Sequence, residues 1–176
     1  MEYNKYLSDT NPIVVFEIEG YGNLEVQLFP DVAPNTVRNM VYLVENNAFD
    51  NSSFHRIIAG FMIQGGQSKQ KVHQIRGEFK SNGFDNPLKH TRGVISMART
   101  SNPNSATSQF FIMHKDAPHL DGQYAAFGAL VKGYEILDEI AGLRTDSSDK
   151  PYQDVVIKKV SVDKKKMTFD EPVTVD

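Results

Sequence analysis

The chain has 176 residues, of which 40% are hydrophobic and 23% are charged, and its formal net charge at pH 7 is -3. This length and composition predict a single globular domain over residues 1–176, and the negative charge disfavours nucleic acid, whose phosphates require a concentrated basic surface. The chain has no cysteine, which excludes disulfides, thiolate metal sites and a cysteine nucleophile.

No apolar run approaches the roughly 20 residues that a membrane-spanning helix needs. The N-terminal leader is polar and lacks the basic segment and apolar run of a secretory signal. We therefore expect a cytoplasmic protein without a membrane partner. The one compact basic run, Lys164 to Lys166, is followed by acidic residues, so a charged and solvated tail is expected there.

Strand patterns dominate the chain. Phe16 and Ile18 alternate with Glu17 and Glu19, and this period of two is typical of a half-buried strand. Alternation and short apolar runs between turn residues predict about eight strands, in Ile13–Glu19, Leu24–Phe29, Phe54–Gln67, Ile75–Phe79, Val94–Ala98, Gln109–His114, Phe127–Val131 and Asp154–Val162.

Apolar residues recur at helical spacing in two places, Pro34 to about Asn46 and Gly133–Ala141. The count of many short strands and two helices fits a mostly β fold. We expect an eight-stranded antiparallel closed β-barrel capped by two α-helices, because closure removes the exposed edges of short strands.

The stretch Phe54–Gln67 places an arginine in apolar surroundings. Residues two apart share one face of a strand, so Arg56 is expected beside Phe54 and Ile58. A guanidinium near apolar surface costs several kcal/mol unless acceptors surround it. Arg56 therefore has a buried structural partner, the commoner case for such arginines, or it awaits a ligand.

Two predicted strands each offer a glutamine and a large apolar side chain on one face. Gln109 shares a face with Phe111, and Met62 shares a face with Gln64. This is the composition of a small, mostly apolar pocket with few polar anchors. A core with two satisfied glutamines explains the pattern equally well.

Other chemical motifs are missing. The five histidines have no metal-ligand spacing, and the chain has neither a GxSxG elbow nor a GxGxxG loop in a strand-to-helix context. We expect no metal and no cofactor.

Four separated motifs, FHRIIAGFMIQGG, GVISMA, SATSQFFI and HLDG followed by FG, resemble the cyclophilin family of peptidyl-prolyl cis-trans isomerases. The resemblance covers about residues 13–162, and the loop after Gly65-Gly66 is similar to that of bacterial members. It implies the barrel with two helices already expected, and an enzyme that accelerates isomerisation of X-Pro bonds in unfolded or flexible proteins, assisting their folding.

The resemblance also implies roles for particular residues. Arg56 would be the catalytic residue, oriented by Gln64, while Gln109 and the main chain of Ala98, Arg99 and Thr100 would hold the peptide. The proline ring would lie against Phe61, Met62, Phe111 and Leu120, with Tyr124 as an aromatic wall where the family commonly has histidine. Arg99 stands where asparagine is common, and we expect this exchange to be tolerated because the role is largely main-chain.

His119 stands where the family commonly has a tryptophan that binds cyclosporin, so only weak binding of that inhibitor is expected. The alternative function is a proline-peptide binding or chaperone-like module whose role does not depend on turnover. A barrel with a small apolar ligand inside is disfavoured, since small barrels fill with their own side chains. We expect a monomer.

Overall fold

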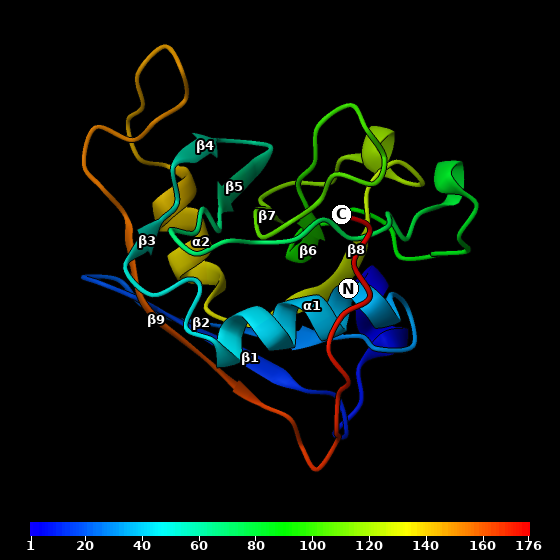
Figure 1. The fold of residues 1–176 in the computed structure, drawn as a ribbon. Coiled ribbons are helices and arrows are strands. Elements are labelled where there is room, and N and C mark those ends of the chain that lie inside the picture. The colour runs from blue at the N-terminus through cyan, green and yellow to red at the C-terminus, as the bar shows by residue number, and fades with distance from the viewer.

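The computed structural model describes residues 1–176, and its main feature is one antiparallel sheet that curls around a core, with two α-helices beside it (Figure 1). The elements in chain order are η1 (Glu2–Tyr6), β1 (Ile13–Ile18), β2 (Gly22–Leu28), α1 (Pro34–Glu45), β3 (Ser52–Ser53), β4 (Arg56–Ile58), β5 (Met62–Gly65), η2 (Lys80–Asn82), β6 (Val94–Met97), β7 (Phe110–Met113), η3 (Pro118–Leu120), β8 (Ala126–Lys132), α2 (Tyr134–Ala141) and β9 (Val156–Asp163).

The sheet has the strand order β3-β9-β1-β2-β8-β6-β7-β5-β4. The predicted mostly β, antiparallel fold with two α-helices is confirmed. The sheet has nine strands and forms a curled half-barrel. Its two edge strands, β3 and β4, follow each other in the chain but do not pair with each other. The count differs from eight because Phe54–Gln67 forms two strands, β3 is additional, and Ile75–Phe79 forms none.

Only a single bridge, from Ile75 to Ala106, remains of the strand predicted at Ile75–Phe79. Gly77 lies so close to the Phe79 ring and to the Pro103 carbonyl that a Cβ at this position would collide with both. Only glycine fits this close approach, and the backbone forms no ladder beyond the single bridge.

Helix α1 begins at Pro34, where the missing N–H has no helical partner to lose. A distant carboxylate serves as its N-terminal cap. The buried Glu78 accepts hydrogen bonds from the backbone N–H of Thr36 (2.7 Å), from the Thr36 hydroxyl (2.6 Å) and from the N–H of Asn35 (3.3 Å). A negative charge at this end also complements the helix dipole, so Glu78 fixes the helix to the loop that precedes η2.

Helix α2 follows directly after β8. Gly133 precedes it with φ 104°, and a Cβ there would lie 2.7 Å from the Asn23 carbonyl oxygen. Glycine is therefore needed for the turn. Leu137 and Ile140 are fully buried, as their helical spacing predicts.

The core gathers on one face of β7. Phe110 is fully buried, with ring centroids of Phe16, Phe49 and Phe54 at 5.2, 5.6 and 6.1 Å. Aromatic contacts of this kind contribute about 0.5–1.5 kcal/mol each beyond the buried area. This cluster holds β7 firmly, and the opposite face of the same strand is left to build a site.

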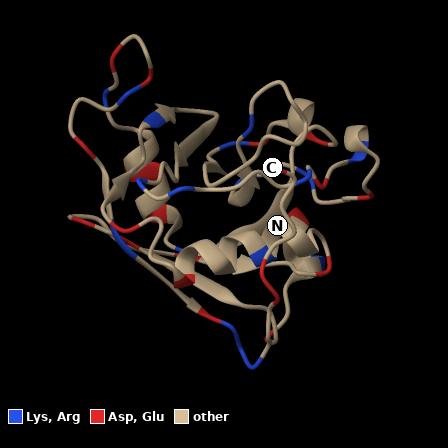
Figure 2. Cartoon of the chain, in the orientation of Figure 1, with Lys and Arg blue, Asp and Glu red and all other residues tan.

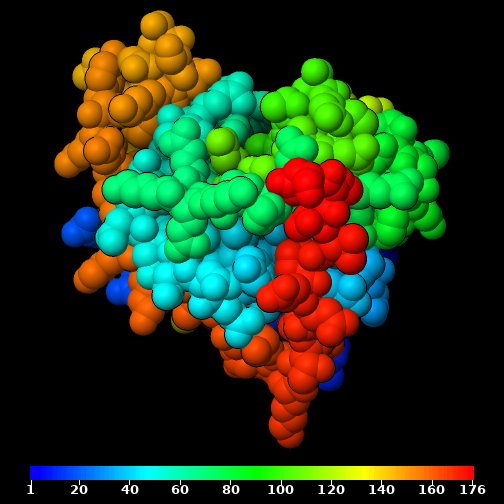
Figure 3. Space-filling view, viewed as in Figure 1, coloured from blue at the N-terminus to red at the C-terminus, as the bar shows by residue number.

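Both chain ends pack onto the domain. Tyr3 in η1 is buried, and its hydroxyl donates to the Leu130 carbonyl at 2.9 Å. The C-terminal tail runs across the face that carries α1 (Figure 3), where the Val173 N–H donates to Asn35 Oδ1 at 2.8 Å and Asp176 pairs with His73 at 3.1 Å. The tail therefore lies along the domain, while none of its residues 163–176 is buried.

Charged residues of both signs are scattered along the chain (Figure 2). Most ion pairs are exposed, such as Lys164 with Glu45 at 2.9 Å, and contribute about 0–1 kcal/mol each. No helix has the length and apolarity needed to cross a membrane.

Candidate active site

Four neighbouring strands place one residue each in a single row. Arg56 on β4 is opposite Gln64 on β5, Gln64 is opposite Phe111 on β7, and Phe111 is opposite Ser96 on β6. Directly paired residues of antiparallel strands project from the same face. The sheet order thus aligns residues that are far apart in the sequence, such as Arg56 and Phe111.

The row borders a small cavity of about 170 Å³. Nine residues line it, namely Arg56, Phe61, Met62, Gln64, Ala98, Arg99, Phe111, Leu120 and Tyr124. Clefts for drug-sized ligands begin at roughly 300 Å³, so this cavity suits one small ring and the backbone beside it. All nine residues are among those that the sequence predicts for the site.

A larger hollow of about 480 Å³ lies on the loop after α2, between Leu143, Arg144, Tyr152 and Gln153. Only these four side chains surround it, and Tyr152 is 71% exposed. No set of polar groups converges there, so the smaller cavity is the candidate active site.

Arg56 is exposed, so of the two alternatives left open by the sequence the buried structural partner is not found. Strand β4 is the edge of the sheet, so the face that carries Arg56 opens to solvent. Its Nη1 donates to Gln64 Oε1 at 3.3 Å, and Gln64 Nε2 donates to Gln109 Oε1 at 3.0 Å. Arg56 has no carboxylate partner, so the chain of amides holds the guanidinium without neutralising it.

Three predicted site residues lie outside the lining. Gln109 stands behind Gln64, and Thr100 is turned toward Ser105, with its N–H and hydroxyl both donating to Ser105 Oγ at 2.9 and 2.7 Å. His119 is exposed and stacks on Phe61, with ring centroids 5.9 Å apart and planes at 29°. His119 is therefore a rim residue.

The Arg99 side chain is part of the wall, contrary to the expectation of a largely main-chain role. Its guanidinium carbon lies 4.6 Å from the Tyr124 ring centroid and 4.9 Å from that of Phe79. Nε and Nη2 donate to the Gln123 carbonyl at 3.1 and 2.7 Å, and Nη1 donates to the Thr100 carbonyl at 2.8 Å. Sequence reasoning missed this because the two rings come from distant segments.

A second group missed by sequence reasoning lies beneath Phe111. His90 stacks on Phe111 with centroids 6.0 Å apart, and its Nε2 and Nδ1 lie 2.8 Å from Ser96 Oγ and 3.1 Å from Asp121 Oδ1. A carboxylate only accepts, so Nδ1–H donates to Asp121 and Nε2 accepts from Ser96. Ser96 is fully buried, so the group supports Phe111 and has no access to substrate.

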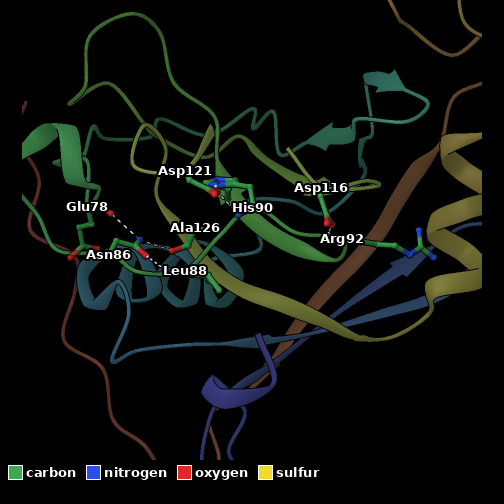
Figure 4. Close-up of polar contacts among 9 residues, drawn as sticks. Glu78, Asn86, Leu88, His90, Arg92, Asp116, Asp121 and Ala126 are labelled. Carbon is green, nitrogen blue, oxygen red and sulfur yellow. Dashed lines mark hydrogen bonds and ion pairs between the residues drawn. The ribbon is translucent and has the colours of Figure 1, made fainter. Parts of the chain in front are cut away.

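The segment that carries His90 is held at both ends (Figure 4). Before it, Asn86 Nδ2 donates to the carbonyls of Glu78 and Ala126, at 3.0 and 2.9 Å. After it, the Arg92 N–H donates to Asp116 Oδ1 at 2.9 Å, while Asp121 accepts the His90 N–H at 2.6 Å. Asp121 directly follows Leu120, so this network fixes two walls of the cavity together.

We expect stability to fall in mild acid because of His90. Burial lowers the pKa of His90, against the opposing pull of Asp121. A histidine with a lowered folded pKa contributes stability that is fully present above its ordinary pKa of about 6.5 and is lost as pH falls toward the folded value. Urea unfolding of wild type and His90→Gln from pH 7 to 5 tests this: the variant should be less stable but less pH-dependent. Identical slopes would contradict it.

The fold and the cavity define a β-rich domain of the curled-sheet class, with one small, mostly apolar recess bordered by an arginine that has no ion-pair partner. Residues 13–162 match the family model described as cyclophilin type peptidyl-prolyl cis-trans isomerase. The chain belongs to this family, and its activity is peptidyl-prolyl cis-trans isomerisation. The range matched agrees with the range expected from the four motifs.

Curated relatives agree with this assignment. Peptidyl-prolyl cis-trans isomerase A of Dickeya dadantii is 43% identical over 153 residues, which cover 83% of this chain and 80% of the relative. Isomerase B of Escherichia coli is 38% identical over 155 residues, covering 81% and 94%. Similarity to bacterial members, expected from the loop after Gly66, is confirmed.

A solved cyclophilin-type isomerase from Cryptosporidium parvum, studied in the presence of the dipeptide Ala-Pro, superposes with a TM-score of 0.76 and 32% identity. The match covers 86% of this chain and 98% of that one.

Proposed function

We propose that Arg56 is the catalytic residue, that the cavity holds the proline ring, and that the substrates are X-Pro bonds in unfolded or flexible proteins whose folding the enzyme assists. The observation that carries this proposal is Arg56 in the wall of a proline-sized apolar cavity, held by Gln64 yet not neutralised. The presence of Ala-Pro with the Cryptosporidium relative supports a prolyl ligand for the same fold.

The reaction needs a hydrogen-bond donor and a pocket that holds the proline ring. No covalent bond is made or broken. Rotation about a peptide bond has a barrier of about 18–20 kcal/mol because amide resonance must be broken. In the twisted transition state the imide nitrogen regains its lone pair and becomes a better hydrogen-bond acceptor. A guanidinium N–H aimed at that nitrogen stabilises the transition state more than either ground state, which is the condition for catalysis.

Because Arg56 is exposed in the free protein, the bound peptide also serves to shield its guanidinium from water. A bound chain that inserts its proline between Phe61, Met62 and Phe111 also covers the guanidinium. Removal of water strengthens the hydrogen bond at the moment it is needed. Holding the ring while the preceding residue turns supplies the positioning part of catalysis.

A peptide-binding module that does not depend on turnover is the second candidate. The apolar recess alone would suffice for it, whereas turnover requires the Arg56 guanidinium that Gln64 holds. NMR exchange spectroscopy on an Ala-Pro peptide separates the two functions, because binding broadens both isomers and only catalysis exchanges their magnetisation. Line broadening without exchange would support the second candidate. The cytoplasmic location and monomeric state stay predictions.

We predict that kcat/KM changes little between pH 6 and 8. No proton is transferred in this mechanism, so the bell-shaped profile of paired acid and base groups should be missing. Burial lowers the pKa of His55, next to Arg56, which favours its neutral form in this range. Initial rates in a three-component buffer of constant ionic strength test it, with His119→Ala as the control for the rim histidine. A single steep loss of rate, abolished in His119→Ala, would contradict the mechanism.

A further inference from the structure

Arg99 is immobilised in the cavity wall by neutral partners only. Its guanidinium lies over two aromatic rings, and three of its N–H groups donate to the carbonyls of Gln123 and Thr100. Backbone carbonyls and rings hold a cation in place without cancelling its charge. The positive charge is therefore fixed at one position in the wall.

Arg92 shows how the same chain treats an arginine that is purely structural. Its guanidinium also lies over a ring, 5.0 Å from the Tyr134 centroid, but both of its terminal nitrogens bind the Asp138 carboxylate, at 2.6 and 2.9 Å. Arg99 and Arg56 form no ion pair, and both line the cavity. The only charged residues in the lining are thus two cations.

No carboxylate lines the cavity to balance them. Asp121, adjacent to Leu120 in the chain, lies outside the lining, and its Oδ1 is occupied by the N–H and ring of His90. The whole chain carries -3, so a positive recess is a local property of this site. A recess of about 170 Å³ brings any residue flanking a bound proline close to these charges, and a concave wall concentrates their field.

We propose that Arg99 is a specificity-determining residue that makes the site prefer prolyl peptides with a carboxylate side chain next to the proline. The inference rests on the proposed function, since it assumes that the cavity holds the proline. Arg56 contributes to the same field, but its role in turnover prevents its use as a test of specificity.

The test compares, for each enzyme, the kcat/KM values of peptides that differ only in the residue next to proline. A general loss of activity lowers all these values together and leaves their ratio unchanged. Otherwise identical peptides carry Glu, Gln or Lys immediately before the proline, or immediately after it. For wild type at low ionic strength, we expect kcat/KM for the Glu peptide to exceed that for the Lys peptide by at least about threefold at one of these positions. An effect of this size is typical of partly exposed charge interactions. The ratio should fall toward one in 1 M salt, where the screening length is about 3 Å.

Two substitutions separate charge from wall structure. Arg99→Gln removes the charge and the wall contacts, so its ratio should fall clearly below that of wild type, to the part that Arg56 contributes. Arg99→Lys keeps the charge but loses the planar fork, so it should retain most of the ratio even where its overall activity is lower. Arg38→Gln on α1 is the matched control, since it removes the same charge from a residue outside the cavity and should keep the wild-type ratio.

The outcomes are distinct. A wild-type ratio of one at both flanks, a ratio that persists in 1 M salt, or a ratio unchanged in Arg99→Gln would each overturn the role of Arg99. An enzyme that turns over none of the peptides, the neutral Gln peptide included, would instead contradict the proposed function. Should Arg99→Gln fail to fold, Arg99→Lys and the salt dependence of the wild-type ratio still decide the question.

Discussion

Replacing Arg56 with alanine is expected to lower kcat/KM by on the order of 10² or more while the fold stays intact, as for the loss of one well-placed transition-state donor. The structure supports an undisturbed fold, because Arg56 is an exposed residue on an edge strand with a single long hydrogen bond, 3.3 Å, to Gln64. Few contacts are lost apart from the donor itself.

The measurement is a protease-coupled or NMR exchange assay on a proline peptide, with Tm and peptide Kd determined for the same samples. Kd should change by only a few-fold, because the ring still meets Phe61, Met62 and Phe111. Arg38→Ala, which also removes a guanidinium, is the control and should keep wild-type turnover. A folded Arg56→Ala protein with wild-type kcat/KM would show that Arg56 is not the catalytic residue.

Gln64→Leu adds a finer test of the same geometry. It removes the acceptor for Arg56 and the donor to Gln109 while preserving size. If the amide chain serves to aim the guanidinium, kcat should fall by less than in Arg56→Ala and KM should change little. A change confined to KM would mean that Gln64 holds the peptide instead.

The strands of this fold were predictable where periodicity is local. The alternation in Ile13–Ile18 fixes which side chains face the core. The cross-strand pairing of Gln64 with Phe111 is seen only in the structure. The residues that line the cavity could be predicted only from the four motifs together. No single motif specifies which strands become neighbours.

What sequence reasoning missed depends on contacts between distant segments. The surroundings of Arg56 stayed open between a buried structural partner and a ligand, because alternation cannot tell an edge strand from a central one. The side-chain role of Arg99 requires Phe79 and Tyr124, and the support of Phe111 by His90 requires Asp121. The loops between the strands bring these residues together, and the sequences of loops have no periodic pattern from which such contacts could be predicted.

The last prediction concerns cyclosporin, which we expect to bind weakly to this protein and at least tenfold more tightly to His119→Trp. His119 is exposed at the rim, stacked on Phe61 at 5.9 Å, in the position where the resemblance to cyclophilins implies an inhibitor-binding tryptophan. A tryptophan there presents a large apolar face and an N–H donor, the kind of residue that dominates binding energy. Roughly 80 Å² of extra apolar contact at about 25 cal/mol per Å² gives about 2 kcal/mol, or some thirtyfold in affinity.

Catalysis should respond far less to His119→Trp than inhibitor binding does. The proposed proline site is bounded by Phe61, Met62, Phe111 and Leu120, and position 119 lies outside that lining. We expect kcat/KM on a short proline peptide to change by only a few-fold. Titration of both proteins with cyclosporin, by calorimetry and by inhibition, measures the separation, with His119→Phe as a control that adds aromatic area without the donor. Equal cyclosporin affinities for wild type and His119→Trp would show that the rim residue does not limit binding.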